Sequence, residues 1–383
     1  MINLTSQIKM KKLAFIIRSL DRGGAERQVV TLAKYLPKSQ YKIYVFCYYA
    51  GGKLERELQE HQVEIIDLKK GGRWDVIGFF SRLLYQMRRI NPDIVHGYMG
   101  PNLLTIFLKP FLPATQMIWG IRTSYLDFSQ YDWFWRMEFN LECWLSRFAD
   151  LIIANSYAGQ EHRVAHGFPS ERMMVIPNGI DLERFKPDPE VRIRVRTEWG
   201  ITENTILIGF VARLDPIKDH PTFLQAVDLL CQERQDVCFV CVGGGAYPEY
   251  AKTLEPLAEQ LGVAAKVIWA GEHSDMSAVY NALDIATSSS YGEGFPNAVA
   301  EAMACGVPCV VTDVGDSAKI VADTGIVVPQ KNSEALANGL KQCLTMDTKE
   351  MGIRARERIV ENFRVENLVK RTQDALEKLL FHD

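Results

Sequence analysis

Long apolar runs are missing from this sequence of 383 residues: no stretch reaches the roughly 18 consecutive apolar residues of a membrane-spanning helix. Cysteine is scarce, with 8 residues, which excludes a disulfide scaffold and favours a reduced, cytosolic setting. No D-x-D pair occurs, so nothing supports a metal-bridged diphosphate, and no metal or other cofactor is expected. The G-x-G-x-x-G dinucleotide fingerprint is also absent, which disfavours a nicotinamide oxidoreductase.

The composition is otherwise that of an ordinary globular protein, 47% hydrophobic and 24% charged, with a formal net charge of −3. The length fits two domains of roughly 180 residues. Charge is uneven, because residues 1–180 hold 23 Lys and Arg against 16 Asp and Glu, whereas the remainder holds 21 against 31. The basic half is therefore expected to face an anionic ligand or membrane surface, unless the two halves simply attract each other.

Short Val- and Ile-rich runs alternate with helical periodicity along the chain. Because strands that are apolar on both faces belong to parallel sheets flanked by helices, the pattern predicts two doubly wound α/β domains in tandem. The boundary is placed at Pro177-Asn178-Gly179, where turn residues and prolines interrupt the periodicity. Residues 351–363 and 364–380 are expected to be helical. The predicted strands are 13–17, 42–49, 63–68, 93–99, 116–122, 150–156, 205–214, 237–243, 266–271, 285–290, 308–313 and 324–329.

Candidate binding residues follow the predicted strands of the second half, which is where doubly wound sheets bind their ligands. Arg213 lies at the end of one strand and Lys218 follows five residues later, a pair of cations suited to a diphosphate. Taken alone, the pair fits solvated surface charges equally well. Gly244, in a Gly-Gly-Gly loop after the next strand, lets the backbone approach a ligand closely, and His273 follows the strand after that.

The segment SSSYGEGFPNAVAEAMACG (288–306) carries the most specific pattern. Glu293 and Glu301 lie eight residues apart, and Pro296 is expected in the first turn of a helix that contains Glu301. The amino end of such a helix attracts anions. Carboxylates beside a phosphate site are suited to accept hydrogen bonds from hydroxyl groups. Extrapolating the helix backwards puts Glu293, at the loop, and Glu301, deeper in the helix, along one wall. The other candidate contacts in this segment are Gly294, Phe295, Asn297 and Ala298.

The first half offers fewer candidates. Gly24, in RSLDRGGAE, opens a predicted helix and presents a second helix amino end. His96 lies in the fourth strand and Arg122 at the end of the fifth. An Arg there can donate to a hydroxyl group or carry charge beside a diphosphate, but it cannot act as a base near neutral pH. For His96 alone, a hydrogen-bonded core histidine is an equal interpretation.

These motifs together resemble retaining glycosyltransferases of family 4 with the GT-B fold, in which two Rossmann-like domains face a central cleft. The resemblance spans the chain through GGAE, IPNGIDLERF, ARLDPIKDH and EGFPNAVAEAMACGVPCVV. It implies an acceptor-binding domain of residues 1–177 plus a returning C-terminal helix, 364–383. Residues 178–363 would then bind the nucleotide-sugar donor.

Carried over to this chain, the resemblance implies that Arg213 and Lys218 hold the donor diphosphate and act in catalysis. Glu301 would bind the ribose and Glu293 the donor sugar, with Glu293 also a catalytic candidate. Gly24 would lie beside the phosphates and the acceptor.

The sequence departs from the family in two places. His96-Gly97-Tyr98 replaces an H-x-H, and Arg122 stands where a His near the reacting sugar is common. Both His96 and Arg122 are kept as catalytic candidates. The departures argue against an acid/base role at these positions and bear on the sugar preference, but they leave the reaction class unchanged.

The expected function is retaining, metal-independent transfer of a sugar from a UDP-sugar to a glycan or lipid-linked acceptor in bacterial polysaccharide synthesis. Three alternatives stay open: a UDP-sugar 2-epimerase, a soluble small-molecule glycosyltransferase, and a non-catalytic nucleotide-sugar binding protein. No nucleic acid partner is expected. Aromatic, basic segments at 73–90 and 131–148 are either core helices or helices that lie in a membrane interface. The chain is expected to be cytoplasmic and peripheral on the inner membrane.

Overall fold

The structure is a computed structural model that describes residues 10–21, 23–72, 74–124, 133–245 and 247–381, without the side chains of 133–135 and 381. It divides into two compact units. Unit 1 comprises Met1–Gly179 and Val365–Asp383, and unit 2 comprises Ile180–Arg364. The sequence placed the division at 177 and the return at 364, within two residues of the bounds found here.

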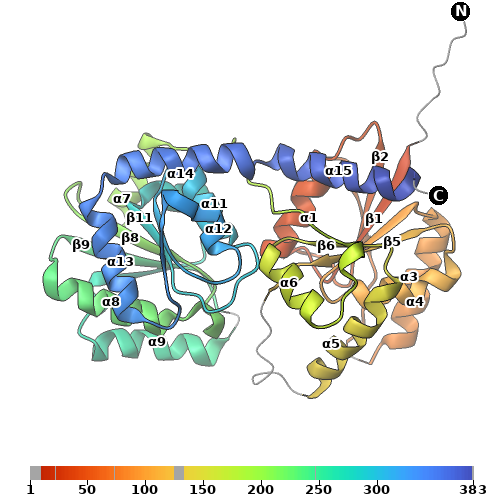
Figure 1. Cartoon of the computed structure of the whole chain (residues 1–383), viewed down its shortest axis with the longest axis horizontal. Helices are drawn as coiled ribbons and strands as arrows, with labels where there is room; N and C mark the ends of the chain where they lie inside the picture. Colours follow the sequence, from red (N-terminus) through yellow and green to blue (C-terminus); the bar gives the residue numbers. More distant parts are fainter. Residues whose placement is uncertain (1–9, 22, 73, 125–132, 246, 382–383) are drawn as a thin grey trace, which may run out of the picture. The chain divides into compact units, whose positions relative to one another are not determined.

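Unit 1 is built on a parallel seven-stranded sheet with helices on both faces, in the order β3-β2-β1-β4-β5-β6-β7 (Figure 1). Its strands are β1 (Lys11–Ile17), β2 (Tyr41–Cys47), β3 (Glu64–Asp67), β4 (Ile94–Tyr98), β5 (Gln116–Ile121), β6 (Leu151–Ala154) and β7 (Met173–Val175). Its α-helices are α1 (Gly24–Tyr35), α2 (Glu55–Glu60), α3 (Val76–Ile90), α4 (Asn102–Leu108), α5 (Trp133–Leu145), α6 (Tyr157–Ala165) and α15 (Val365–Phe381), with short 3₁₀ turns η1 (Lys109–Phe111), η2 (Ser146–Phe148) and η3 (Ser170–Arg172).

Unit 2 is built on a parallel six-stranded sheet in the order β10-β9-β8-β11-β12-β13 (Figure 1). Its strands are β8 (Ile206–Val211), β9 (Val237–Val242), β10 (Val267–Gly271), β11 (Ile285–Ser288), β12 (Cys309–Thr312) and β13 (Ile326–Val328). Its helices are α7 (Pro189–Glu198), α8 (His220–Glu233), α9 (Pro248–Gln260), α10 (Met276–Ala282), α11 (Asn297–Ala304), α12 (Ser317–Val321), α13 (Ser333–Thr345) and α14 (Thr348–Asn362), with η4 (Pro216–Lys218), η5 (Ala264–Lys266) and η6 (Ala322–Thr324).

All twelve predicted strands are present, and the doubly wound prediction is confirmed. The reason is burial on both faces: β4, β11 and β12 are buried along their whole length, as continuous Val and Ile runs require. Strand β7 was not predicted, because its three residues, Met-Met-Val, are too few to establish a period. Among the described residues, no helix is long and apolar enough to cross a membrane.

The C-terminal helix α15 packs on α1 within unit 1. Its Val365, Leu368 and Leu376 belong to the same buried cluster as β1 and β2 side chains. Gly179, at the end of the first pass through unit 1, touches this helix so closely that an added Cβ would lie 2.8 Å from the Cα of Val365. The chain therefore needs a glycine where it passes beneath α15.

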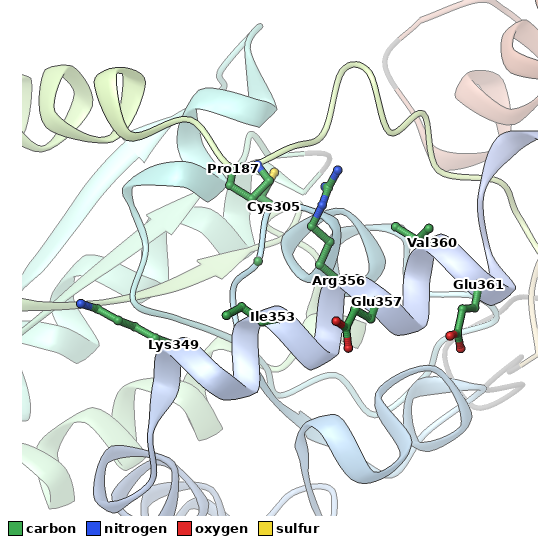
Figure 2. Close-up of a pocket in the computed structure, with 9 residues that line it drawn as sticks. Pro187, Cys305, Lys349, Ile353, Arg356, Glu357, Val360 and Glu361 are labelled. Carbon is green, nitrogen blue, oxygen red and sulfur yellow. The ribbon is translucent and has the colours of Figure 1, made fainter.

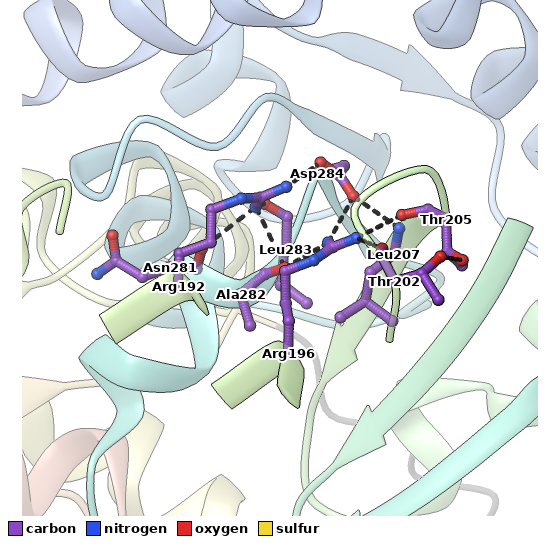
Figure 3. Close-up of polar contacts among 9 residues, drawn as sticks. All are labelled: Arg192, Arg196, Thr202, Thr205, Leu207, Asn281, Ala282, Leu283 and Asp284. Atoms are coloured by element: carbon purple, nitrogen blue, oxygen red, sulfur yellow. Dashed lines mark hydrogen bonds and ion pairs between the residues drawn. The ribbon is translucent and has the colours of Figure 1, made fainter. Parts of the chain in front are cut away.

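An ion-pair network ties the first helix of unit 2 to its sheet (Figure 3). Asp284, just before β11, accepts from Arg192 at 2.6 Å and from Arg196 at 2.9 Å, both on α7. The same carboxylate accepts from the backbone N–H of Leu207 in β8 at 2.7 Å. Arg192 and Arg196 also donate to the carbonyl of Ala282 at the end of α10. One carboxylate thus joins α7, β8 and the entry to β11.

Candidate functional site

Each sheet has one point where the strand order reverses direction. In unit 2 this point lies between β8 and β11, and in unit 1 between β1 and β4. At such a point the loops leaving two neighbouring strands turn to opposite faces of the sheet, and a crevice opens beyond their carboxyl ends. The predicted site residues can therefore be compared with two expected ligand sites, one at the switch point of each unit.

In unit 2 the loops that follow β8 and β11 are bonded directly to each other. The Ser289 hydroxyl donates to the carbonyls of Lys218, at 3.0 Å, and Asp219, at 2.9 Å. The backbone N–H of Tyr291 donates to the carbonyl of Ile217 at 3.0 Å. Buried backbone groups in loops need such partners. The predicted strand 285–290 included all three serines, whereas β11 ends at Ser288, and Ser289 instead bonds the neighbouring loop.

This connection brings Lys218 and Glu293 together, as the sequence analysis expected of residues in one site. The Nζ of Lys218 lies 2.5 Å from Oε1 of Glu293, and the Ser290 hydroxyl donates to the same oxygen at 2.7 Å. The two charged side chains are 19% and 11% exposed. A charged pair this far out of bulk water is held in a defined geometry, although it retains some contact with solvent.

Glu301 has a different environment. It lies on α11, and its Oε2 accepts from the hydroxyl of Tyr280, on α10, at 2.9 Å. Burial and the Glu301 charge hold the pKa of Tyr280 well above its ordinary value, so the phenol stays protonated and keeps donating. Glu293 lies in the loop before α11, where the sequence analysis placed it. The two carboxylates have separate partners.

The remaining predicted residues of unit 2 follow β8, β9 and β10. Arg213 is mostly exposed and pairs with Asp215 at 3.1 Å. Leu214 donates its N–H to the carbonyl of Gly244 at 2.8 Å, which places the Gly-Gly-Gly loop beside the Arg213 loop. An added Cβ on Gly244 would lie 2.2 Å from a Glu272 carboxylate oxygen, so a larger residue here requires the exposed Glu272 side chain to move. The His273 ring stands edge-on to the Trp199 ring at 5.8 Å.

The start of α11 corrects one expectation and qualifies another. Pro296 is the residue before the helix, with φ −73° and ψ 92°, and Asn297 is the first helical residue. Within the described residues no side chain caps this end, and Asn297 and Ala298 are half-buried there. Phe295 is buried against Phe363, with ring centroids 5.5 Å apart, so its side chain belongs to the core.

Sequence reasoning missed the loop after β12. Gly315 has φ +57°, and an added Cβ would lie 2.4 Å from the backbone oxygen of Glu293. The next residue, Asp316, donates its N–H to the carbonyl of Gly294 at 2.9 Å. This loop therefore packs directly against the Glu293 loop. A Val-Gly-Asp directly after a predicted strand was the available signal.

In unit 1 the predicted residues His96 and Arg122 lie together. The Arg122 guanidinium stacks 4.2 Å from the centroid of the Tyr98 ring and donates to the Tyr98 hydroxyl at 2.5 Å. A second donor nitrogen of Arg122 lies 3.3 Å from Oδ1 of Asn178. His96 is 1% exposed, and burial together with the Arg122 charge holds its pKa well below the ordinary value. His96 is therefore neutral at physiological pH.

A residue of helix α1 holds the backbone beside Asn178. Gln28 donates to the carbonyl of Gly179 and accepts from the Gly179 N–H, each at 3.2 Å. This reciprocal pair fixes the backbone next to Asn178. Helix α1 itself begins at Gly24, as predicted, and no side chain of the described residues caps it.

Unit 2 also has a hollow away from these loops, along one face of α14 (Figure 2). None of the predicted site residues lines it. Burial raises the pKa of its Cys305 thiol to about 12, so this sulfur is protonated and unreactive at neutral pH. The lining residues are Pro187, Cys305, Gly306, Lys349, Ile353, Arg356, Glu357, Val360 and Glu361.

Two protein-family models match the chain, one for each unit. Residues 22–184 match Glycosyltransferase Family 4, and residues 191–365 match Glycosyl transferases group 1. Together the matches leave only the two ends and a short segment at the unit boundary uncovered.

Individual proteins give the same result. A Bacillus subtilis protein named "Putative glycosyltransferase EpsF" is 26% identical over 344 residues, which is 85% of each chain. A D-inositol 3-phosphate glycosyltransferase of Corynebacterium urealyticum is 32% identical over 216 residues, which is 54% of this chain and 51% of that one. The crystal structure of Anabaena Alr3699/HepE in complex with UDP-glucose superposes with a TM-score of 0.85 at 23% identity, covering 96% of this chain and 99% of that one. The chain thus shares the two-domain GT-B fold.

Proposed function

The chain belongs to glycosyltransferase family 4, and we propose that it transfers a hexose from a UDP-sugar to a glycan or lipid-linked acceptor in bacterial glycoconjugate synthesis, with retention of configuration. The observation that carries the proposal is the Lys218–Glu293 pair, held at the switch point of unit 2 by bonds between the β8 and β11 loops. The UDP-glucose in the Anabaena structure supports a UDP-sugar as donor.

The proposed roles follow from charge. Arg213, Lys218 and the amino end of α11 would stabilise the departing diphosphate without a metal ion. Glu301 would accept hydrogen bonds from the ribose hydroxyls, and Glu293 would accept one from a hydroxyl of the donor sugar. The bond between the anomeric carbon and the phosphate oxygen breaks through a short-lived ion pair, and the acceptor hydroxyl oxygen bonds to the anomeric carbon from the same face. The hydroxyl proton passes to the departing diphosphate oxygen. Isolation of a covalent glycosyl-enzyme would overturn this step.

The donor is tested by a thermal-shift panel of UDP, GDP and ADP, each free and as common sugar conjugates. A ligand present at 100 times its Kd stabilises the folded state by about 2.7 kcal/mol, which raises the Tm by about 5–10 °C for domains of this size. We expect that shift with uridine nucleotides, with or without EDTA. The absence of a shift with every nucleotide would contradict the proposed donor site.

The same conjugates separate the alternatives when UDP release is followed. Release that depends on an added acceptor supports transfer. Conversion of the donor to its 2-epimer without acceptor would show an epimerase, and binding without release or epimer would show a non-catalytic protein. Product NMR distinguishes retention from inversion at the anomeric carbon.

We also propose that unit 1 binds an anionic lipid surface through α3, α4, η1, the end of α5 and η2. One face of α3 is buried, whereas Trp74 and Ile77 at its start are 89% and 84% exposed. The Arg88 guanidinium lies over the Phe111 ring, and Lys109 joins η1 to the carbonyl of Phe148. Exposed aromatic and basic side chains together are typical of interfacial helices. The exposed apolar residues of this lipid-facing surface are Trp74, Ile77, Tyr85, Phe107, Phe111, Trp144 and Phe148.

Flotation with vesicles tests this surface. We expect the full chain to float with vesicles that contain phosphatidylglycerol and to stay behind with pure phosphatidylcholine. Trp74→Ser combined with Ile77→Ser should lower the bound fraction at least fivefold. The matched control is Ile353→Ser, which removes a 61% exposed isoleucine from unit 2. Equal flotation of all three proteins would exclude this surface.

A further inference from the structure

Among the residues that the structure describes, no carboxylate pairs with Arg122. Its side chain is largely buried, and its described partners are the neutral Tyr98 and Asn178. Its Nε has no hydrogen-bond partner among the described residues. Other buried guanidinium groups in this protein differ: Arg163 pairs with Glu142 at 2.8 Å, and Arg196 pairs with Asp284 at 2.9 Å. A buried charge that lacks a counter-ion is costly to the folded state.

The groups around Arg122 can donate hydrogen bonds, but they do not neutralise its charge. Since the Tyr98 hydroxyl accepts from Arg122, and no other bond to it occurs among the described residues, its own hydrogen remains to be donated. The Nε2 of His96, 1% exposed, is also unpartnered within the described part of the chain. Because burial and the neighbouring charge keep His96 neutral, Arg122 is the one cation of this group.

The position of this group matches a ligand site. Tyr98 is the last residue of β4, and Arg122 comes directly after β5, its neighbour in the sheet. Strand β4 borders the switch point of unit 1, so both side chains stand at the carboxyl edge where doubly wound sheets bind ligands. The Gln28–Gly179 pair fixes the backbone next to Asn178, whose Oδ1 accepts from the guanidinium. Arg122 is therefore fixed in place, not loosely exposed.

We propose that Arg122, with Tyr98, binds an oxyanion carried by a substrate of the transfer reaction, either a carboxylate or a phosphate. A planar guanidinium with free N–H groups can bind either group through a bidentate pair of hydrogen bonds, and the Tyr98 O–H adds a donor. A neutral hydroxyl would leave the buried charge uncompensated, whereas an oxyanion supplies the missing counter-charge. The inference rests on the proposed function, since the oxyanion belongs to the donor or the acceptor.

The test uses the full chain at constant ionic strength and compares matched probes. D-glucuronate is paired with D-glucose, and sn-glycerol 3-phosphate with glycerol, so that each pair differs mainly by the anionic group. We expect at least one anionic probe to bind at least tenfold more tightly than its neutral match. A carboxylate response identifies an acidic sugar, and a phosphate response identifies a phosphorylated substrate.

Arg122→Gln should lose that preference, with at least tenfold weaker binding of the responding anion. Arg56→Gln, which changes an arginine with an 88% exposed side chain on α2, should keep it. The proposal is overturned if no anionic probe is preferred by the unchanged protein, or if Arg122→Gln binds it equally well. UDP titration tests the donor diphosphate as a further source of the oxyanion. Weaker UDP binding in Arg122→Gln assigns the oxyanion to the donor diphosphate, and unchanged UDP binding assigns it to the sugar or the acceptor.

The melting temperature separates a ligand-binding arginine from one that only stabilises the fold. Without ligand, Arg122→Gln should melt at the same temperature as the unchanged protein or higher, because it removes an uncompensated buried charge. Arg196→Gln, which breaks a described ion pair, should melt lower. A Tm loss in Arg122→Gln as large as in Arg196→Gln would show a structural role instead. Failure of UDP to bind the unchanged protein would count against the proposed donor site, and the probe pairs would still decide the oxyanion site.

Discussion

Lys218→Met and Glu293→Gln are each expected to lower kcat/KM for sugar transfer by about 100- to 1,000-fold, which corresponds to about 3–4 kcal/mol of lost transition-state stabilisation. The physical reason is the position of both charges at the carboxyl edge of unit 2, where Ser290 and the β8 loop hold them in a fixed geometry. A fixed Lys218 cation stabilises a departing diphosphate more than a mobile one, and a fixed Glu293 carboxylate orients the donor sugar. The measurement is acceptor-dependent UDP release with the nucleotide sugar that responds in the thermal-shift panel.

The two substitutions should affect different kinetic constants, and their effects on the rate should not be additive. Lys218→Met is expected mainly to weaken donor binding, and Glu293→Gln mainly to lower kcat. Since the side chains touch, the double variant should lose less than the product of the single losses. Lys252→Met is the matched control, because that lysine forms an exposed pair with Glu249 and should leave the rate unchanged. Single-variant rates within threefold of the unchanged protein would contradict the assignment of this site.

Asp284→Ala is expected to destabilise unit 2 by about 3–5 kcal/mol, because it leaves Arg192, Arg196 and the Leu207 N–H without their shared carboxylate (Figure 3). A loss of that size lowers the Tm by about 10 °C in a unit of this length. The measurement is urea unfolding of the full chain, followed by a probe in unit 2 such as the fluorescence of Trp199.

The control for this prediction is Glu183→Ala, whose carboxylate is 92% exposed and pairs with Lys186 at 3.5 Å. An exposed pair of this kind contributes less than about 1 kcal/mol. Asp284→Asn separates charge from hydrogen bonding, since the amide oxygen can still accept from Leu207. Asp284→Ala with the same unfolding midpoint as Glu183→Ala would show that the network does not hold α7 on the sheet.

How much of this structure the sequence predicts depends on the range of the interaction. Strand positions, the restart of the pattern after Gly179 and the α11 segment depend on local hydrophobicity and turn residues, and they were predicted. The start of α11 was misplaced by one residue, because Pro296 is as acceptable just before a helix as in its first turn. Strand β7 was too short to carry a pattern.

Side-chain partners were beyond local reasoning. Arg122 and Asn178 are 56 residues apart, and Gln28 and Gly179 are 151 residues apart. Nothing in the local pattern around Glu301 indicates Tyr280 as its partner, because helix packing decides which side chains meet. The roles given to Arg213, Lys218, Glu293 and Glu301 remain predictions, although the structure places Lys218 and Glu293 in contact.

The central claim is that unit 2 binds the donor nucleotide through Lys218 and its neighbours. Isothermal titration of UDP into the full chain and into Lys218→Met, with Lys252→Met as the control, tests it most directly. The account predicts saturable 1:1 binding by the unchanged protein and by the control, and a Kd at least tenfold higher for Lys218→Met, a difference of about 1.4 kcal/mol. Equal Kd values for all three proteins, or no binding of UDP by the unchanged protein, would contradict it.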